Sequence, residues 1–183
     1  YGTIKTLVGP NDHIIIDTLA HACLQEGARN ATANVHAFPH LSFHAVERVL
    51  LRIRRKEPQA GILVATETVF SMDSDVPDIT QLQEICRASD ATLMVDVAHD
   101  LGCIGVDGRG YLGIQDMVGK VDLVMGSFSK TFASNGGFVA TQHPALKLAL
   151  RYNCGPLTFT NALSPIQASV VSACLKVIQS DEG

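Results

Sequence analysis

Four short apolar runs recur along the chain, and longer stretches with apolar residues at helical spacing separate them. The runs are HIII (13 to 16), GILVAT (61 to 66), TLMVDV (92 to 97) and VDLVMG (121 to 126). Continuous apolar runs of this length are typical of strands that are buried on both faces of a parallel sheet. We therefore predict four parallel strands that are joined by crossover helices.

The stretches between and after the runs predict five helices, at 18–29, 43–56, 79–89, 144–153 and 165–179. The third helix has one apolar stripe, and the last begins with Ser-Pro, a cap followed by proline at the first helical position. Five glycines between positions 102 and 113 predict an irregular loop. The pattern as a whole predicts an α/β fold with three layers, α/β/α, around a mainly parallel sheet.

Length and composition agree with a folded domain. With 183 residues, 46% hydrophobic and 17% charged, the chain can bury a core, so we expect one domain or part of one. It begins with YGTIKTLVG and not with Met, which suggests an excerpt or a processed piece. No apolar segment approaches the ~20 residues that cross a bilayer, and no signal pattern is present, so we expect a soluble protein without a transmembrane segment.

Charge and cysteine content exclude several classes of function. The net charge of −4 gives no support for binding to nucleic acid or to an acidic membrane. One basic cluster, Arg52, Arg54, Arg55 and Lys56, predicts the solvated face or C-terminal end of a helix, with a contact to an anionic substrate tail as the alternative. Five scattered cysteines without Cys-x-x-Cys spacing predict neither a zinc site nor a disulfide framework, and they favour a reducing, cytoplasmic setting.

Polar side chains follow each predicted strand, where ligands bind in open α/β sheets. They are Asp17 and His21, then Glu67 and Ser71, then Asp96 and His99, then Ser127, Ser129 and Lys130. The carboxyl ends of parallel strands meet at one edge of a sheet. We therefore expect these groups to gather at one rim.

Lys130 and Asp96 together match the needs of pyridoxal phosphate (PLP). Burial of Lys130 among small residues would favour the neutral amine that forms a Schiff base. A carboxylate such as Asp96 keeps the pyridine nitrogen protonated, and Ser127 and Ser129 can bind the phosphate. Taken alone, Asp96 can also be a helix or loop cap, and His99 a core histidine.

Two other readings of the lysine segment are weaker. SFSK is also Ser-x-x-Lys, the nucleophile signature of penicillin-recognising acyl-enzymes, but the partner elements Ser-Asp-Asn and Lys-Thr-Gly are absent. A nicotinamide-binding fold lacks its signature too, because no Gly-x-Gly-x-x-Gly follows a strand.

Four segments in order, HACLQEGAR, TETVFSMDSDVPDI, VDVAHDLGCIGVDGRG and GSFSKTFASNGGF, resemble the α-oxoamine synthases. These are fold-type I PLP enzymes, among them serine palmitoyltransferase and 8-amino-7-oxononanoate synthase. The resemblance covers nearly all of the chain and implies the large, PLP-binding domain of an aspartate aminotransferase-like fold over residues 1–183. Family members are about twice as long, so an N-terminal segment and a C-terminal small domain are expected outside this chain.

The resemblance also implies roles for single residues. Lys130 would be the Schiff-base lysine and Asp96 the partner of the pyridinium. His99 would lie near the phenolic oxygen of the cofactor with Ser71 close by, and His21 would stack on the ring and take part in catalysis.

The implied phosphate site extends to a second subunit. Ser127 matches a phosphate-binding position, and Thr160 matches a hydroxyl that a neighbouring subunit supplies, so a homodimer with its active site at the interface is implied. The motif around His99 departs from the usual Asp-Glu-Ala-His-Ser, with Val97 in the Glu place and Asp100 in the Ser place.

The activity that the resemblance implies is a decarboxylative condensation. An α-amino acid would react with acyl-CoA or an acyl-carrier thioester to give an α-oxoamine and CO2. Two alternatives stay open: another fold-type I enzyme, such as a class II aminotransferase or a lyase, and a catalytically silent partner subunit. The motifs leave open which amino acid and which acyl chain react.

Overall fold

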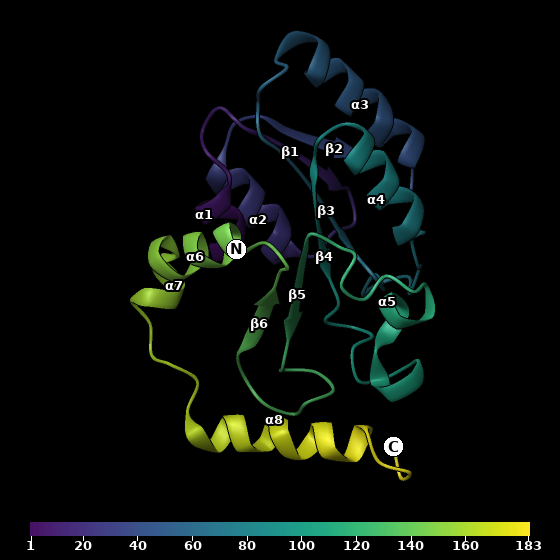
Figure 1. The fold of residues 1–183 in the computed structure, drawn as a ribbon, viewed down its shortest axis with the longest axis vertical. Coiled ribbons are helices and arrows are strands. Elements are labelled where there is room, and N and C mark those ends of the chain that lie inside the picture. Colours follow the sequence, from purple (N-terminus) through teal and green to yellow (C-terminus); the bar gives the residue numbers. More distant parts are fainter.

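Six strands form one sheet in the computed structural model, which describes residues 1–183 (Figure 1). Their order across the sheet is β2-β1-β3-β4-β5-β6, and only β6 runs antiparallel to its neighbour. The strands are β1 His13–Asp17, β2 Val35–Phe38, β3 Ile62–Glu67, β4 Thr92–Asp96, β5 Leu123–Ser127 and β6 Gly137–Ala140. The four predicted strands are β1, β3, β4 and β5, whereas β2 and β6 were not predicted.

Eight α-helices surround the sheet. They are α1 Gly2–Leu7, α2 Ala22–Ala31, α3 Phe43–Lys56, α4 Ile79–Ala88, α5 Gly110–Ile114, α6 Pro144–Asn153, α7 Gly155–Thr158 and α8 Pro165–Ile178. All five predicted helices are present, but α2 begins later than predicted because His21 caps it after a turn. The glycine-rich loop is not wholly irregular, since it contains α5 and one 3-10 turn.

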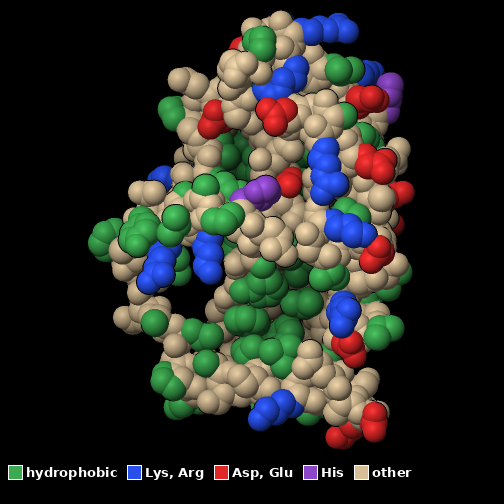
Figure 2. Space-filling view, viewed as in Figure 1, with side chains coloured by type: hydrophobic (Ala, Val, Ile, Leu, Met, Phe, Trp, Pro, Cys, Tyr) green, Lys and Arg blue, Asp and Glu red, His purple; other side chains and the backbone are tan.

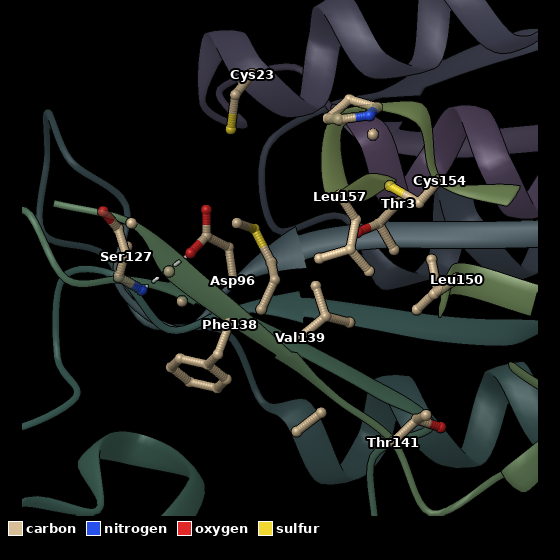
Figure 3. A pocket seen from close by; sticks show the side chains of 18 of the residues that line it. Thr3, Cys23, Asp96, Ser127, Phe138, Val139, Thr141, Leu150, Cys154 and Leu157 are labelled. Carbon is tan, nitrogen blue, oxygen red and sulfur yellow. Dashed lines mark hydrogen bonds between the residues drawn. The ribbon is translucent and has the colours of Figure 1, made fainter. Parts of the chain in front are cut away.

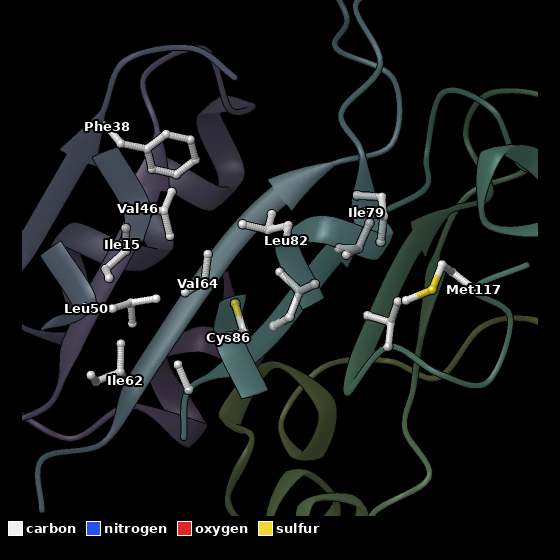
Figure 4. Packing of buried hydrophobic residues seen from close by; sticks show 14 of the residues in the cluster. Ile15, Phe38, Val46, Leu50, Ile62, Val64, Ile79, Leu82, Cys86 and Met117 are labelled. Carbon is white, nitrogen blue, oxygen red and sulfur yellow. The ribbon is translucent and has the colours of Figure 1, made fainter. Parts of the chain in front are cut away.

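The strands β1, β3 and β4 are buried on both faces, and their alternate residues pack into two separate cores. Ile15 and Val64 pack with α3 and α4 on one face (Figure 4). Ile14, Ile16 and Leu63 pack with α1 and α2 on the other face. The helices therefore form a layer on each side of the sheet, which confirms the predicted three-layer α/β/α fold.

The basic cluster lies in the last turns of α3, as predicted, but its members differ in role. Arg54 is tied to the backbone: its guanidinium donates hydrogen bonds to the carbonyl oxygens of Ser89 at 2.7 Å, Ala60 at 2.6 Å and Asp90 at 2.6 Å. Arg55 is exposed. No residue of the cluster lines the cavity described below, so the contact with a substrate tail finds no support.

Apolar side chains stay exposed near the C-terminal end of the chain. Phe159 is 88% exposed and Ile166 is 75% exposed, and α8 buries only Val171. Figure 2 shows hydrophobic side chains gathered between the sheet and α8. No helix has the length and hydropathy needed to cross a bilayer. Phe159 and Ile166 thus have little packing within this chain.

Candidate active site

A cavity of about 1070 Å³ opens beside the carboxyl ends of β4 and β5, on the side of the sheet that α1, α2 and α6 cover (Figure 3). Its lining includes five of the eight predicted site residues, namely His21, Asp96, Ser127, Ser129 and Lys130. Segments that are far apart in sequence thus meet at one rim, as the parallel sheet predicts.

Asp96 is the last residue of β4 and is 5% exposed. Its Oδ1 accepts a hydrogen bond from the Ala98 N–H at 2.9 Å, and no protein donor bonds its second oxygen. Burial raises the pKa of Asp96, while the Ala98 N–H and the positive charge of Lys130 act in the opposite direction. Asp96 can therefore accept a hydrogen bond from a cationic group inside the cavity.

Lys130 follows β5 in a turn whose Ala133 N–H donates to the Lys130 carbonyl oxygen at 3.0 Å. The prediction that small neighbours bury this lysine is wrong for this chain, because its side chain is exposed. Ser129 and Ala133 are also exposed, and neither is large enough to cover a four-carbon side chain. The amine of Lys130 is therefore reachable from the cavity.

Two hydroxyl groups lie together at the start of this turn. Ser127 Oγ and Ser129 Oγ are 2.7 Å apart, and the Ser129 N–H donates to Ser127 Oγ at 3.2 Å. A side chain at Gly137 would bring a Cβ within 2.5 Å of the Gly126 carbonyl oxygen, so β6 needs glycine there to approach β5. The turn thus offers two hydroxyls, which are suitable donors for a phosphate.

His21 is the N-cap of α2 and is held at two points. Its side-chain Nδ1 accepts a hydrogen bond from the Cys23 backbone N–H at 3.2 Å, and its backbone N–H donates to the Glu67 carboxylate. Cys23 lies on the same rim, and its side chain points toward Asp96 across the cavity (Figure 3). Burial raises the pKa of the Cys23 thiol, and the charge of Asp96 adds to the rise.

The other three predicted site residues do not line the cavity. His99 is half-buried in the turn after β4, and burial and the charge of Lys130 lower its pKa. Ser71 is exposed after β3. The Thr160 hydroxyl, which is also exposed, donates to the carbonyl oxygen of Pro156.

Three further residues belong to this region. Glu67 ends β3 beside Asp96, at the rim where its place after a buried strand predicted it, but it was assigned no role in the site. Lys147 and Arg151 were not predicted. Both line the cavity from α6. Their spacing of four residues predicts a shared helix face, but the sequence does not show that this face meets the sheet.

Asp100, which replaces the serine usual in the histidine motif, is 1% exposed. Its carboxylate accepts hydrogen bonds from the Thr68 hydroxyl at 2.5 Å and the Tyr111 N–H at 2.6 Å. Asp100 therefore anchors the glycine-rich loop to the segment after β3. This departure from the motif has a structural role here.

The donors around the cavity fit PLP and not a metal ion. No group of three or more His, Cys, Asp and Glu side chains is placed to hold a metal. A buried carboxylate with an unpaired oxygen, a reachable amine and paired hydroxyls share one cavity, at Asp96, Lys130, Ser127 and Ser129. These are the groups that a pyridine nitrogen, an aldehyde carbon and a phosphate require.

Comparison with known proteins agrees with this chemistry. The family model for aminotransferase class I and II matches residues 2–182. Serine palmitoyltransferase of Sphingomonas paucimobilis is 34% identical over 99% of this chain, and 8-amino-7-oxononanoate synthase of Beijerinckia indica is 38% identical over 98% of it. The solved structure of a Sphingomonas wittichii serine palmitoyltransferase superposes with a TM-score of 0.89 at 31% identity over 97% of this chain.

The matches cover only part of each relative. This chain spans 42% and 46% of the two enzymes and 44% of the solved chain. The predicted resemblance is confirmed, because both named enzymes are α-oxoamine synthases, and the fold-type I prediction is confirmed by the superposition. From residue 2 to residue 182, the chain belongs to the aminotransferase class I and II family.

Proposed function

We propose that residues 1–183 are the PLP-binding large domain of an α-oxoamine synthase. The whole protein would condense an α-amino acid with an acyl-CoA or acyl-carrier thioester and release CO2 and the free thiol. The observation that carries the proposal is that Asp96 and Lys130 line the same cavity, in a chain whose relatives include enzymes named for this chemistry. We also infer a cytoplasmic setting from five cysteines that are all free.

The residues present fit PLP, and each would hold a different part of it. Asp96 would bind the pyridine nitrogen, Lys130 the aldehyde carbon, and the hydroxyls of Ser127 and Ser129 the phosphate. His21 would lie against the ring. When bound, PLP supplies an electron sink that stabilises negative charge on the α-carbon of the amino acid.

The chain's own groups would then move and hold protons. Lys130 is exposed toward the cavity and would take the proton from the α-carbon. Asp96 is buried, and burial raises its pKa, so its carboxylate would be stabilised by a cation opposite it and would keep a proton on the ring nitrogen there. Lys147 and Arg151 add positive charge to the same wall, which suits an anionic substrate.

The roles of His99, Ser71 and Thr160 rest on the family resemblance. His99 would hold the phenolic oxygen of the cofactor with Ser71 nearby. Thr160 would reach the phosphate of a second subunit in a homodimer, and its exposure together with that of Phe159 is compatible with an interface. Dimerisation and these three contacts are proposals about the whole protein.

The activity test uses the full-length protein with PLP and a panel of glycine, serine and alanine against acyl-CoA donors of different chain length. Mass spectrometry identifies the product, and a thiol reagent measures released CoA. We expect one amino acid to give an α-oxoamine together with stoichiometric free thiol, and Lys130→Ala to give neither. Conversion of the amino acid to a keto acid without thioester consumption would instead identify an aminotransferase.

A further inference from the structure

Glu67 is a buried carboxyl group beside the proposed site that has no part in the mechanism above. It is the last residue of β3 and 1% exposed, and its Cα pairs in register with that of Asp96, the last residue of β4. The two carboxyl groups therefore end adjacent parallel strands. A buried carboxylate needs a compensating donor.

The donor that Glu67 finds is the main chain of His21. The His21 N–H bonds to Glu67 Oε1, across 46 positions of sequence. This N–H sits at the N-cap of α2, where backbone donors have no partner within the helix. Glu67 thus connects the end of β3 to the start of the helix that carries His21 into the cavity.

The second bond on His21 cannot replace the first. Cys23 donates to Nδ1 of the imidazole at 3.2 Å, which orients the ring relative to α2 but not relative to the sheet. Asp96 and Lys130 belong to β4 and the turn after β5. Only the Glu67 bond therefore ties the His21 main chain directly to the strand next to Asp96.

We propose that Glu67 is a positioning residue of the cofactor site, whose carboxylate anchors the main chain of His21 and thereby holds the imidazole at the rim shared with Asp96 and Lys130. This inference rests on the proposed function for the cofactor, but the anchor itself is a property of the protein alone.

The charge state of Glu67 sets the strength of this anchor. The pKa of Glu67 is raised to about 7: burial is the main cause and the charge of Asp96 adds to it, while the His21 N–H and Lys130 act in the opposite direction. Other titratable or charged groups act on it from the neighbouring elements, namely Asp17, His21, Cys23 and Lys130. A carboxylate accepts a stronger hydrogen bond than a carboxylic acid, so the anchor tightens as the pH rises through this range.

Two substitutions distinguish the role of the Glu67 hydrogen-bond acceptor from the role of its negative charge. Glu67→Ala removes the acceptor, whereas Glu67→Gln keeps an oxygen acceptor of similar reach but carries no charge at any pH. Glu26→Ala is the matched control, because Glu26 is an exposed acid on α2. All variants are made in the full-length protein, and the circular dichroism of the backbone checks their folding.

The first measurement is amide hydrogen exchange by mass spectrometry, without cofactor, over the peptide that contains His21. We expect Glu67→Ala to speed exchange about tenfold at this N-terminus of α2, Glu67→Gln to change it less, and Glu26→Ala to leave it unchanged. Unchanged exchange in Glu67→Ala overturns the anchor.

The second measurement is the visible circular dichroism of protein-bound PLP, which reports how side chains contact the ring. Glu67→Ala should weaken this signal about as much as His21→Ala does, and the double variant should show no further loss, because both act through one imidazole. If the two single variants each weaken the signal and the double variant loses the sum of both, the positioning role is overturned. If the wild type takes up no PLP, the proposed function fails, and the exchange experiment still decides whether Glu67 anchors His21.

Discussion

Asp96 and Glu67 end adjacent strands, and burial acts on both carboxyl groups in the same direction. Burial raises the pKa of each, and the negative charge of Asp96 raises the pKa of Glu67 further. Lys130 opposes both shifts, since its positive charge favours the carboxylates. Because two partly compensated carboxyl groups lie so close, a cationic partner such as a pyridinium would be bound strongly at Asp96.

The substitution Asp96→Asn tests this electrostatic role. Asparagine keeps the size of the side chain and an acceptor for the Ala98 N–H, but it cannot compensate a protonated ring. We expect turnover of the full-length enzyme to fall about 10²-fold or more, with little loss of fold. Steady-state kinetics with thermal unfolding as the control measure both effects, and a variant with normal turnover would remove Asp96 from the proposed site.

Glu67 also predicts how stability depends on pH. Its pKa rises from an ordinary 4.5 to about 7 in the folded protein. Between these two pH values, the folded state therefore keeps a proton that the unfolded state has already released. The resulting contribution to the free energy of unfolding is fully present below the pKa of Glu67 in the unfolded state. It is lost as the pH rises through the pKa of Glu67 in the folded state. It amounts to about 3 kcal/mol, from roughly 1.4 kcal/mol per pKa unit.

The comparison that isolates this effect is wild type against Glu67→Gln, without cofactor, at about pH 5 and about pH 8. Chemical unfolding should show the wild type losing more stability than the variant on going to the higher pH. An equal loss in both proteins would show that Glu67 does not carry the proton.

At the level of elements, the strands that the sequence predicts are those with continuous apolar runs. β1, β3 and β4 are buried along nearly their whole length, so their residues carry the signal. β2 has one buried residue of four, and β6 has none and begins with Gly137, so neither shows an apolar run or a clear alternation. These two short strands are stabilised by pairing with neighbouring strands, and a local sequence pattern does not show such pairing.

Helices show the same division. The predictions for α3, α6 and α8 match because their start signals or apolar spacing are local, as with the serine cap and proline of α8. α1 is missed because it has six residues and no side-chain cap. Its stability comes from packing on α2 and α6, which the sequence does not display.

Arg54 gives a prediction at this scale, because its side chain donates hydrogen bonds to four carbonyl oxygens near the end of α3. Arg54→Lys keeps the charge but has one donor centre in place of a planar fork, so we expect a loss of about 1–3 kcal/mol in the free energy of unfolding. Arg55→Lys, one position along the helix, should stay within about 0.5 kcal/mol of wild type. Denaturant unfolding of both variants checks the difference, and equal stability would show that the Arg54 bonds contribute little.

At the scale of the whole molecule, we expect the chain to hold only part of the site. It spans less than half of the relatives named above, and its cavity leaves Lys130 exposed. The sequence predicted five of the residues that line the cavity because strand ends converge by topology. Burial of Lys130 was not predicted correctly, because cover for a side chain depends on what packs over the rim and not on its sequence neighbours.

The exposure of other predicted residues also indicates that more protein covers this region. Ser71 and Thr160 are exposed and lie off the cavity, and apolar side chains such as Phe159 and Ile166 are uncovered. Exposed apolar patches of this kind mark surfaces that other protein covers. We therefore expect these residues to take up their proposed roles only in the full-length, assembled enzyme.

The most direct test of the central claim is to locate PLP on the protein. Full-length protein is incubated with PLP, reduced with borohydride, digested and mapped by mass spectrometry. We expect a reduced PLP adduct on Lys130 and none in Lys130→Ala, while Lys147→Ala, which removes another lysine of the same cavity, should keep the adduct. An adduct on a different lysine, or equal labelling of the Lys130→Ala variant, would contradict the claim.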